Sequence, residues 1–247
     1  IKGARPDPGQ PAVRLDPDTV LSPGSWEAAM RAVGAGLEAV DRVFDQSNDI
    51  KNAFCQVRPC GHHAEAERAM GFCLFSNAAI AAHHARANHG ADRVAVIDFD
   101  VHHGNGTQDI FWAETDLFLG STHQMPLYPG TGAIREEGEN GNVCNAPLSP
   151  NDDGGPFREA FRSRIMPALR DFAPDLIIIS AGFDAHEADP LANLRLVEDD
   201  FVWATDKLME SAEQQAGGRV VSMLEGGYDL AALGRSASAH VQMLMGA

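Results

Sequence analysis

The chain has 247 residues, 44% of them hydrophobic and 22% charged, a composition that excludes intrinsic disorder and is sufficient for one large folded domain. Asp and Glu number 35 against 19 Lys and Arg, so the formal net charge is −16. This charge repels phosphates and anionic lipid headgroups, which argues against direct binding to nucleic acid or to a membrane. A cationic substrate or partner is expected instead.

Several features of the sequence indicate an intracellular location. No apolar run approaches the roughly 20 residues of a membrane-spanning helix, and no hydrophobic segment with a cleavage site opens the chain. The four cysteines are too sparse for a disulfide scaffold and lack the Cys-x-x-Cys spacing of a structural zinc site. We therefore expect a cytoplasmic protein.

The N-terminal part of the chain differs from the rest. Residues 1–21 contain four prolines and show neither helical nor strand periodicity, so we expect a loop or a partly ordered segment. Ser22 followed by Pro23 is typical of a helix N-cap and first helical residue. Apolar residues then recur at three- and four-residue steps as far as Phe44, which predicts one amphipathic helix.

From residue 53 onward the sequence predicts alternating strands and helices. The predicted strands are 53–57, 93–99, 117–121, 176–180 and 219–224, and the clearest predicted helices are 77–87, 156–171, 198–215 and 230–244. Two of the strands, 94–99 and 176–180, are apolar on both faces, as expected where helices cover both sides of a parallel sheet. The fold class is therefore α/β, with three layers and a doubly wound, mostly parallel sheet. We expect residues 1–247 to form a single domain in which 126–156 is a long loop.

Charged and imidazole side chains follow each predicted strand, at the edge where parallel sheets bind ligands. Asp98, Asp100 and His102 have the same parity and project to one side if the strand stays extended. Asp184 follows another strand. Asp100, His102 and Asp184 together offer oxygen and nitrogen ligands that suit Zn²⁺ or Fe²⁺ and leave a coordination position for water.

The tandem histidines differ in their surroundings. His83-His84 lies in an Ala-rich helical stretch and is interpreted as surface. His62-His63 lies in a loop after a strand, where both rings can reach the ligand crevice, and imidazole is a natural general base for metal-activated water. Tyr228 follows the flexible Gly226-Gly227 and can donate a hydrogen bond to charge on a substrate oxygen, although a lone Tyr is more often simply packed.

Together these motifs resemble the histone deacetylase family. Six segments occur in the family's order: Arg58-Pro59-Cys60-Gly61-His62-His63-Ala64, Gly71-Phe72-Cys73-Leu74-Phe75, Asp98-Phe99-Asp100-Val101-His102-His103-Gly104-Asn105-Gly106-Thr107-Gln108, Tyr128-Pro129-Gly130-Thr131-Gly132, Ser180-Ala181-Gly182-Phe183-Asp184-Ala185-His186 and Glu225-Gly226-Gly227-Tyr228. Asn105 and the last segment resemble the class II branch, including bacterial deacetylase-like amidohydrolases and acetylpolyamine amidohydrolases. The resemblance implies an arginase-like fold and zinc-dependent hydrolysis of the acetyl amide of a lysine or similar amine, with Fe²⁺ as the alternative metal.

The resemblance also implies roles for individual residues. The implied metal ligands are Asp100, His102 and Asp184. His63 would act as base and acid, with His62, supported by Asp98, as its electrostatic partner, and Tyr228 would polarise the acyl oxygen. The implied substrate channel contains Gly71, Phe72, Tyr128, Leu191 and, by a weaker alignment, Asp18, and a structural K⁺ site would be formed by Asp98, Asp100, His102 and Ser121.

Some positions depart from the family's pattern. Cys60 stands where a second proline is usual and Ser76 where Asn is common. We also expect the chain to lack the family's first strand and helix.

Three alternative functions are left open. Arginase-like ureohydrolases share the implied fold and bind two manganese ions, but Gly104 and His186 stand where further carboxylates are needed, which favours one metal. Leu191 stands where the polyamine-selective branch is expected to place Glu, which favours a lysine substrate over an acetylated polyamine. The third alternative is a catalytically silent relative that binds acetylated ligands. The substrate, the native metal and any oligomerisation are not fixed by the sequence.

Overall fold

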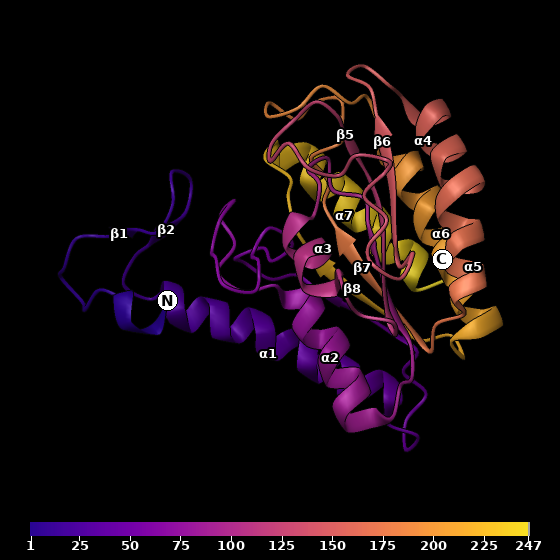
Figure 1. Cartoon of the computed structure of the whole chain (residues 1–247), viewed down its shortest axis with the longest axis horizontal. Helices are drawn as coiled ribbons and strands as arrows, with labels where there is room; N and C mark the ends of the chain where they lie inside the picture. The colour runs from indigo at the N-terminus through magenta and orange to yellow at the C-terminus, as the bar shows by residue number, and fades with distance from the viewer. Residues whose placement is uncertain (247) are drawn as a thin grey trace.

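The computed structural model describes residues 1–246, and a six-stranded parallel sheet forms its centre (Figure 1). The sheet order is β3-β8-β7-β4-β5-β6, and every neighbouring pair is parallel. The strands are β3 (Asn52–Cys55), β4 (Val94–Asp98), β5 (Leu117–Gln124), β6 (Val143–Leu148), β7 (Leu176–Ala181) and β8 (Val220–Leu224).

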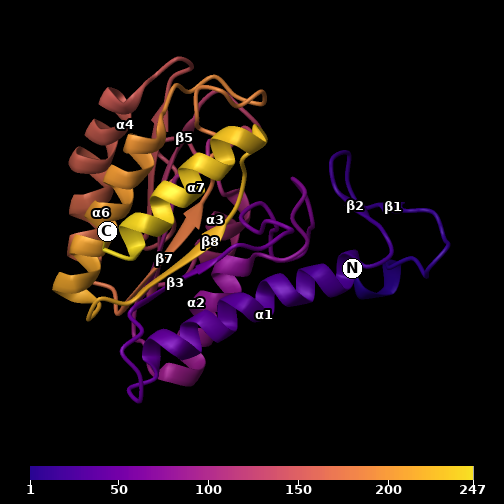
Figure 2. The same cartoon turned by 180° about the vertical axis from the view of Figure 1, so that it is seen from behind.

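Helices cover both faces of this sheet, so the predicted three-layer α/β architecture is confirmed (Figures 1 and 2). One face carries α1 (Ser25–Phe44), α2 (Asn77–His89) and α3 (Asn105–Phe111). The other carries α4 (Gly154–Ala160), the π-helical turn Phe161–Ile165, α5 (Met166–Phe172), α6 (Glu198–Gln215) and α7 (Leu230–Leu244). Within residues 1–246, no helix is both long and apolar enough to cross a membrane.

The alternation of side chains along β4 shows how the sheet joins the two helical layers. Val94 and Val96 pack into the core on the α1 and α2 side, whereas Ala95 and Ile97 pack into the core on the opposite side. All four are fully buried. Burying a Val or Ile side chain contributes about 1.5–3 kcal/mol, so a strand that is apolar on both faces is stable only between two layers.

The path of the chain creates a crevice beside β4. From β4 the chain proceeds to β5 and β6 on one side, and it then returns to place β7 on the other side of β4. Loops that leave the carboxyl ends of β4 and β7 therefore diverge, and the space between them is where open parallel sheets bind ligands. Asp100 and His102 follow β4, and Asp184 follows β7.

The N-terminal segment is more regular than the sequence predicts. After a short 3₁₀ turn (Lys2–Ala4), β1 (Val13–Arg14) and β2 (Val20–Leu21) form a small antiparallel pair, which lies near the start of α1 and apart from the main sheet (Figure 1). Leu21 is fully buried and packs against Ala29 and Leu74. This tertiary contact orders a segment that has no periodicity of its own.

Two local predictions are wrong, and one short helix was not predicted. The first helix begins at Ser25 rather than at Pro23, because Gly24 adopts a φ of +91° and Ser22 instead forms a turn whose N–H donates to Ser25 Oγ. The expected loop 126–156 contains strand β6. Its residues Asn145 and Pro147 obscure the strand pattern, and proline is tolerated there because β6 is at the sheet edge. The short helix α3 was not predicted.

Candidate active site

Asp100, His102 and Asp184 converge in the crevice between β4 and β7. His102 Nδ1 lies 3.1 Å from Asp100 Oδ1 and 3.1 Å from Asp184 Oδ2. One ligand atom from each residue lies within 4.8 Å of the other two. The sequence-predicted metal ligands are therefore brought together, although 82 positions separate His102 from Asp184.

Backbone amides fix the two carboxylates of this triad. The N–H of Gly226 donates to Asp100 Oδ2 at 2.8 Å, and the N–H of Val101 donates to Asp184 Oδ1 at 2.9 Å. A side chain on Gly226 would overlap the carboxylates of Asp100 and Asp184. Each Asp thus has one oxygen anchored by the backbone while its other oxygen faces His102.

The electrostatics of the triad fit a bound cation. Burial and the neighbouring Asp100 raise the pKa of Asp184 to about 7. Burial opposes protonation of His102, but hydrogen bonds to Asp100 and Asp184 raise its pKa to about 10. The cluster therefore retains positive charge between its two carboxylates, and a divalent ion would supply that charge through the same oxygen and nitrogen atoms. Two carboxylates and one imidazole form a donor set that suits Zn²⁺ or Fe²⁺.

The prediction that Asp98, Asp100 and His102 project to one side of an extended strand is only half right. Strand β4 ends at Asp98, so Asp100 and His102 lie in the following loop and do not continue an extended strand. Asp98 is fully buried, and its Oδ2 is 2.9 Å from Nδ1 of His62, the residue that the resemblance implied it supports. Its Oδ1 accepts the N–H of Asp100 at 3.0 Å, which helps to turn the chain.

His62 and His63 lie side by side, with ring centroids 4.1 Å apart, but they have different partners. His62 Nδ1 faces the carboxylate of Asp98. His63 Nδ1 donates to Asn105 Oδ1 at 2.8 Å, because the amide nitrogen of Asn105 is itself donating to Glu65. This tautomer leaves Nε2 of His63 with a lone pair.

The different surroundings of His62 and His63 shift the pKa values of the two rings in opposite directions. Burial opposes charge on His62, but the carboxylates of Asp100 and Asp98 outweigh it and raise the pKa well above its usual value. Burial and then repulsion by His62 hold the pKa of His63 well below its usual range. Burial and the neighbouring charges therefore favour the charged form of His62 and disfavour it on His63, whose neutral ring can accept a proton.

Glu225 positions the histidine loop, a role that sequence reasoning missed. Its buried carboxylate accepts the N–H of Gly61 at 2.6 Å and that of His62 at 3.2 Å, while Ser180 Oγ donates to its other oxygen. Arg58 donates to the backbone oxygen of Glu225 at 2.8 Å. Glu225 and Asn105 both belong to recognised motifs, but their roles depend on contacts between distant loops that no local spacing specifies.

A cavity of about 250 Å³ leads to these groups. All five sequence-predicted channel residues line it, together with three of the predicted chemical groups and Leu127, which was not predicted. The lining residues are Asp18, His63, Gly71, Phe72, His102, Leu127, Tyr128, Leu191 and Tyr228. The rings of Phe72 and Tyr228 meet edge to face at 6.1 Å. Burial, followed by repulsion from Asp100 and Asp184, raises the pKa of Tyr228 well above its usual value, so its hydroxyl remains a donor.

Two contacts shape the rim of this cavity. The buried Thr19 accepts the N–H of Phe72 through Oγ1 at 3.1 Å, which ties the N-terminal hairpin and its Asp18 to the channel wall. Asp189 accepts the N–H of Tyr228 at 2.7 Å and that of Leu191 at 3.0 Å. Neither Thr19 nor Asp189 was predicted to contribute.

Two remaining sequence predictions concern a K⁺ site and the number of divalent ions at the triad. Asp98 and Ser121 are paired in register in β4 and β5, but Ser121 Oγ lies 2.9 Å from His123, so the K⁺ site stays a prediction. His186 Nδ1 accepts the N–H of Ala188, and its Nε2 is 3.5 Å from Glu198. It is therefore directed away from the triad, which favours a site for one divalent ion.

The family model for the histone deacetylase domain matches residues 3–244. The chain belongs to the histone deacetylase family. It is 46% identical over 222 residues to an uncharacterized protein of Synechocystis sp., covering 90% of this chain and 70% of that protein. It is 42% identical over 218 residues to the histone deacetylase-like amidohydrolase of Pseudomonas aeruginosa, covering 87% of this chain and only 57% of that protein.

A solved structure supports the same classification. The crystal structure of the HDA15 HD domain superposes with a TM-score of 0.89 at 38% identity, over 95% of this chain and 66% of that one. The histone deacetylase domain described here therefore has the arginase/deacetylase fold that its sequence resemblance implied. Family membership and the names of its relatives support a hydrolase activity.

Proposed function

We propose that the chain is a zinc-dependent deacetylase that hydrolyses the acetyl amide of acetyl-lysine or a similar acylated amine. The observation that carries the proposal is the arrangement of Asp100, His102 and Asp184 beside a cavity that also contains His63 and Tyr228. A metal-ligand set, a neutral imidazole base and a protonated phenol are the groups that amide hydrolysis requires. Fe²⁺ is the alternative ion for the same ligands.

The residues of the chain would divide the reaction between them. A divalent ion held by the triad supplies Lewis acidity, which polarises the acyl oxygen and acidifies the attacking water. His63 accepts a proton from that water through Nε2 and later delivers it to the leaving amine nitrogen. Cationic His62 favours the negative charge that develops nearby, and the Tyr228 hydroxyl donates to the acyl oxygen as that charge forms.

The lining of the cavity supports an acyl-amine substrate with a chain of methylene groups. Phe72 and Tyr128 are 42% and 37% exposed, so they present aromatic surface to solvent at the channel entrance. These rings would pack along the methylene groups of a lysine side chain. Asp18 lies at the exposed rim, where its carboxylate would accept N–H groups of a substrate backbone.

Turnover of a fluorogenic acetyl-lysine peptide tests the proposal. We expect zinc-loaded protein to hydrolyse the peptide, a strong chelator to abolish turnover, and added Zn²⁺ to restore it. His63→Gln should abolish turnover, whereas His83→Gln, at an exposed position, should not. Binding of the peptide by zinc-loaded, folded protein without any hydrolysis would reject the proposal and support a catalytically silent relative.

Substrate choice can be tested at Leu191, which is 48% exposed and lines the same cavity. Leu191→Glu would place a carboxylate where the distal cation of acetylputrescine could pair with it. An exposed ion pair contributes about 0.2–1 kcal/mol, so kcat/KM for acetylputrescine relative to the peptide should rise by up to about fivefold. Leu191→Gln is the matched uncharged control, and an equal rise in both variants would contradict the electrostatic explanation.

A further inference from the structure

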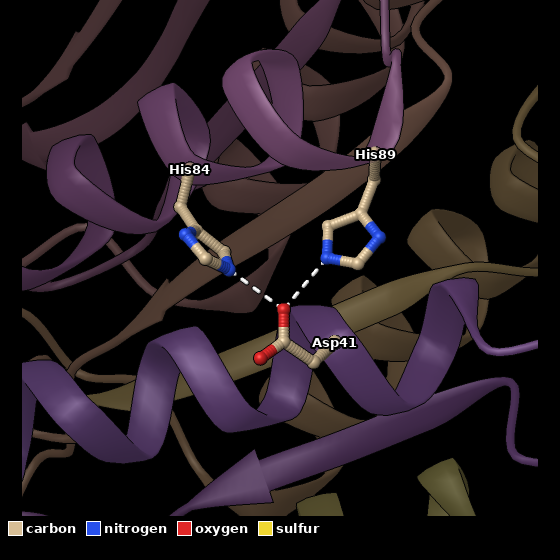
Figure 3. A group of neighbouring side chains, drawn as sticks. All are labelled: Asp41, His84 and His89. Atoms are coloured by element: carbon tan, nitrogen blue, oxygen red, sulfur yellow. Dashed lines mark hydrogen bonds and ion pairs between the residues drawn. The ribbon is translucent and has the colours of Figure 1, made fainter.

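Three side chains outside the candidate active site also converge at one point (Figure 3). Asp41 lies in the last turn of α1, and His84 and His89 lie near the end of α2. Oδ1 of Asp41 is 2.6 Å from Nε2 of His84 and 2.6 Å from Nε2 of His89. The interpretation of His83-His84 as surface is therefore right for His83, which is exposed, and wrong for His84, whose ring turns toward α1.

We propose that Asp41, His84 and His89 form a second site for a divalent late transition metal ion such as Zn²⁺. Their three ligand atoms all lie within 4.8 Å of one another. Two imidazole nitrogens and one carboxylate oxygen are a donor set that such ions prefer over Mg²⁺ or Ca²⁺. An ion at this point would link the two helices that cover one face of the sheet.

Only a small rearrangement is needed to admit the ion. Tetrahedral zinc bonds of about 2.0–2.2 Å place neighbouring ligand atoms about 3.3–3.6 Å apart. The two N···O distances would therefore widen from 2.6 Å into that range as the ion replaces the two shared protons. The side chain of Asp41 is 48% exposed and can turn without disturbing the core, and the partial exposure of both rings gives the ion access from solvent.

The surroundings hold the ligands in place. His84 Nδ1 is 3.0 Å from the side-chain amide of Asn88, and rotation of that amide would present its oxygen to the Nδ1–H of a metal-bound imidazole. The ring of His89 stacks on Phe44 at 5.2 Å. Buried alanines and valines fix the spacing between α1 and α2, including Val40 and Ala85.

The proposed site is separate from the candidate active site. Helix α2 ends at His89 and the chain enters β4 at Val94, so this end of α2 lies near the amino end of β4. Asp100 and His102 follow the opposite, carboxyl end of the same strand. The two sites therefore share no ligand.

Zinc counting tests the proposal on the full chain. After removal of metals, Zn²⁺ is titrated against a chromophoric chelator, and the double variant His84→Asn, His89→Gln should bind one equivalent less than the wild type. His83→Gln, altered at the exposed neighbour, should bind as many equivalents as the wild type. Asn88→Ala should weaken the affinity of this site about tenfold. Equal zinc stoichiometry in the wild type and the folded double variant would overturn the proposal.

A second measurement avoids any risk that the variants fold poorly. Wild-type protein is modified with diethylpyrocarbonate, and the rate at each histidine is read by mass spectrometry. Zn²⁺ should slow modification of His84 and His89 at least fivefold and leave that of His83 unchanged. Equal modification of His84 and His89 with and without Zn²⁺ would show that Asp41 and the two rings form only a hydrogen-bonded link between helices.

Discussion

The two Asp and His clusters use the same side chains in contrasting surroundings. One cluster, Asp100, His102 and Asp184, lies in the loops that follow the carboxyl ends of β4 and β7, and at most 9% of each residue is exposed. Asp41, His84 and His89 come from two helices, and their side chains are 48%, 20% and 22% exposed. We refer to these as the buried triad and the exposed triad.

The difference shows how burial changes what a carboxylate and an imidazole do. In the buried triad, charges interact strongly through a medium that screens them poorly, and backbone N–H groups fix both carboxylates. In the exposed triad, water screens the same interactions, so without an ion they stabilise the fold only weakly. The buried triad suits catalysis, whereas the exposed triad suits reversible binding.

The largest expected effect is at the buried triad. Asp184→Ala should reduce zinc binding there from one equivalent to none and abolish turnover, because two ligands remain and one anchored carboxylate is lost. Metal analysis after dialysis measures the change, and Asp199→Ala, at an exposed position on α6, is the control. Full zinc content in the Asp184 variant would identify the wrong ligand and remove the basis of the comparison.

The next effect concerns the phenol beside the buried triad. Tyr228→Phe should lower kcat by about 10²–10³, or about 2.7–4 kcal/mol, with zinc content unchanged, because a donor to the developing oxyanion is lost. Tyr128→Phe is the matched control at the only other tyrosine in the chain, where the ring rather than the hydroxyl forms the channel wall. A decrease below threefold in the Tyr228 variant would contradict its role.

His240 lies outside both triads and shows what burial alone, without carboxylates, does to the pKa of an imidazole. His240 is fully buried, donates from Nδ1 to Thr205 Oγ1 and accepts from Ser222 Oγ at Nε2. Burial lowers its pKa from 6.5 to about 4. The unfolded chain therefore binds more protons between these values, and stability is lost as the pH falls below about 6.5.

This shift predicts a measurable loss of stability in mild acid. Between pH 7 and pH 5, His240 should reduce the free energy of unfolding by about 2 kcal/mol. Urea unfolding at the two pH values should show that His240→Gln loses about 2 kcal/mol less than the wild type over this interval. His83→Gln, at an exposed histidine, should follow the wild type, and identical pH dependence in all three proteins would refute the assignment.

The smallest effect is expected at the exposed triad. In the presence of chelator, Asp41→Asn should lower the free energy of unfolding by only about 0.2–1 kcal/mol, the value of exposed ion pairs. Added Zn²⁺ should then stabilise the wild type but not the variant, which thermal unfolding would detect. A loss above about 2 kcal/mol without zinc would mean that the exposed triad is a structural link comparable in strength to buried contacts.

Much of the central sheet was predictable because its strands carry continuous apolar runs. The predicted segments 93–99 and 176–180 correspond to β4 and β7, and the helices at 198–215 and 230–244 match α6 and α7. Strand β6 was not predictable in the same way, because its edge position tolerates polar residues and Pro147. The N-terminal hairpin was missed because contacts of Leu21 with distant residues order it.

The sequence by itself determined the α/β architecture, the family resemblance and the identity of the groups that gather at the carboxyl edge of the sheet. Only the tertiary structure decided that Glu225 holds the backbone of the His62 loop, that Asn105 leaves His63 with a free Nε2, and that His84 turns toward Asp41. Periodicity and motif order follow from short-range geometry, which a sequence records directly. Hydrogen-bond partners, protonation and burial arise between residues tens of positions apart, so they are fixed only when the layers pack.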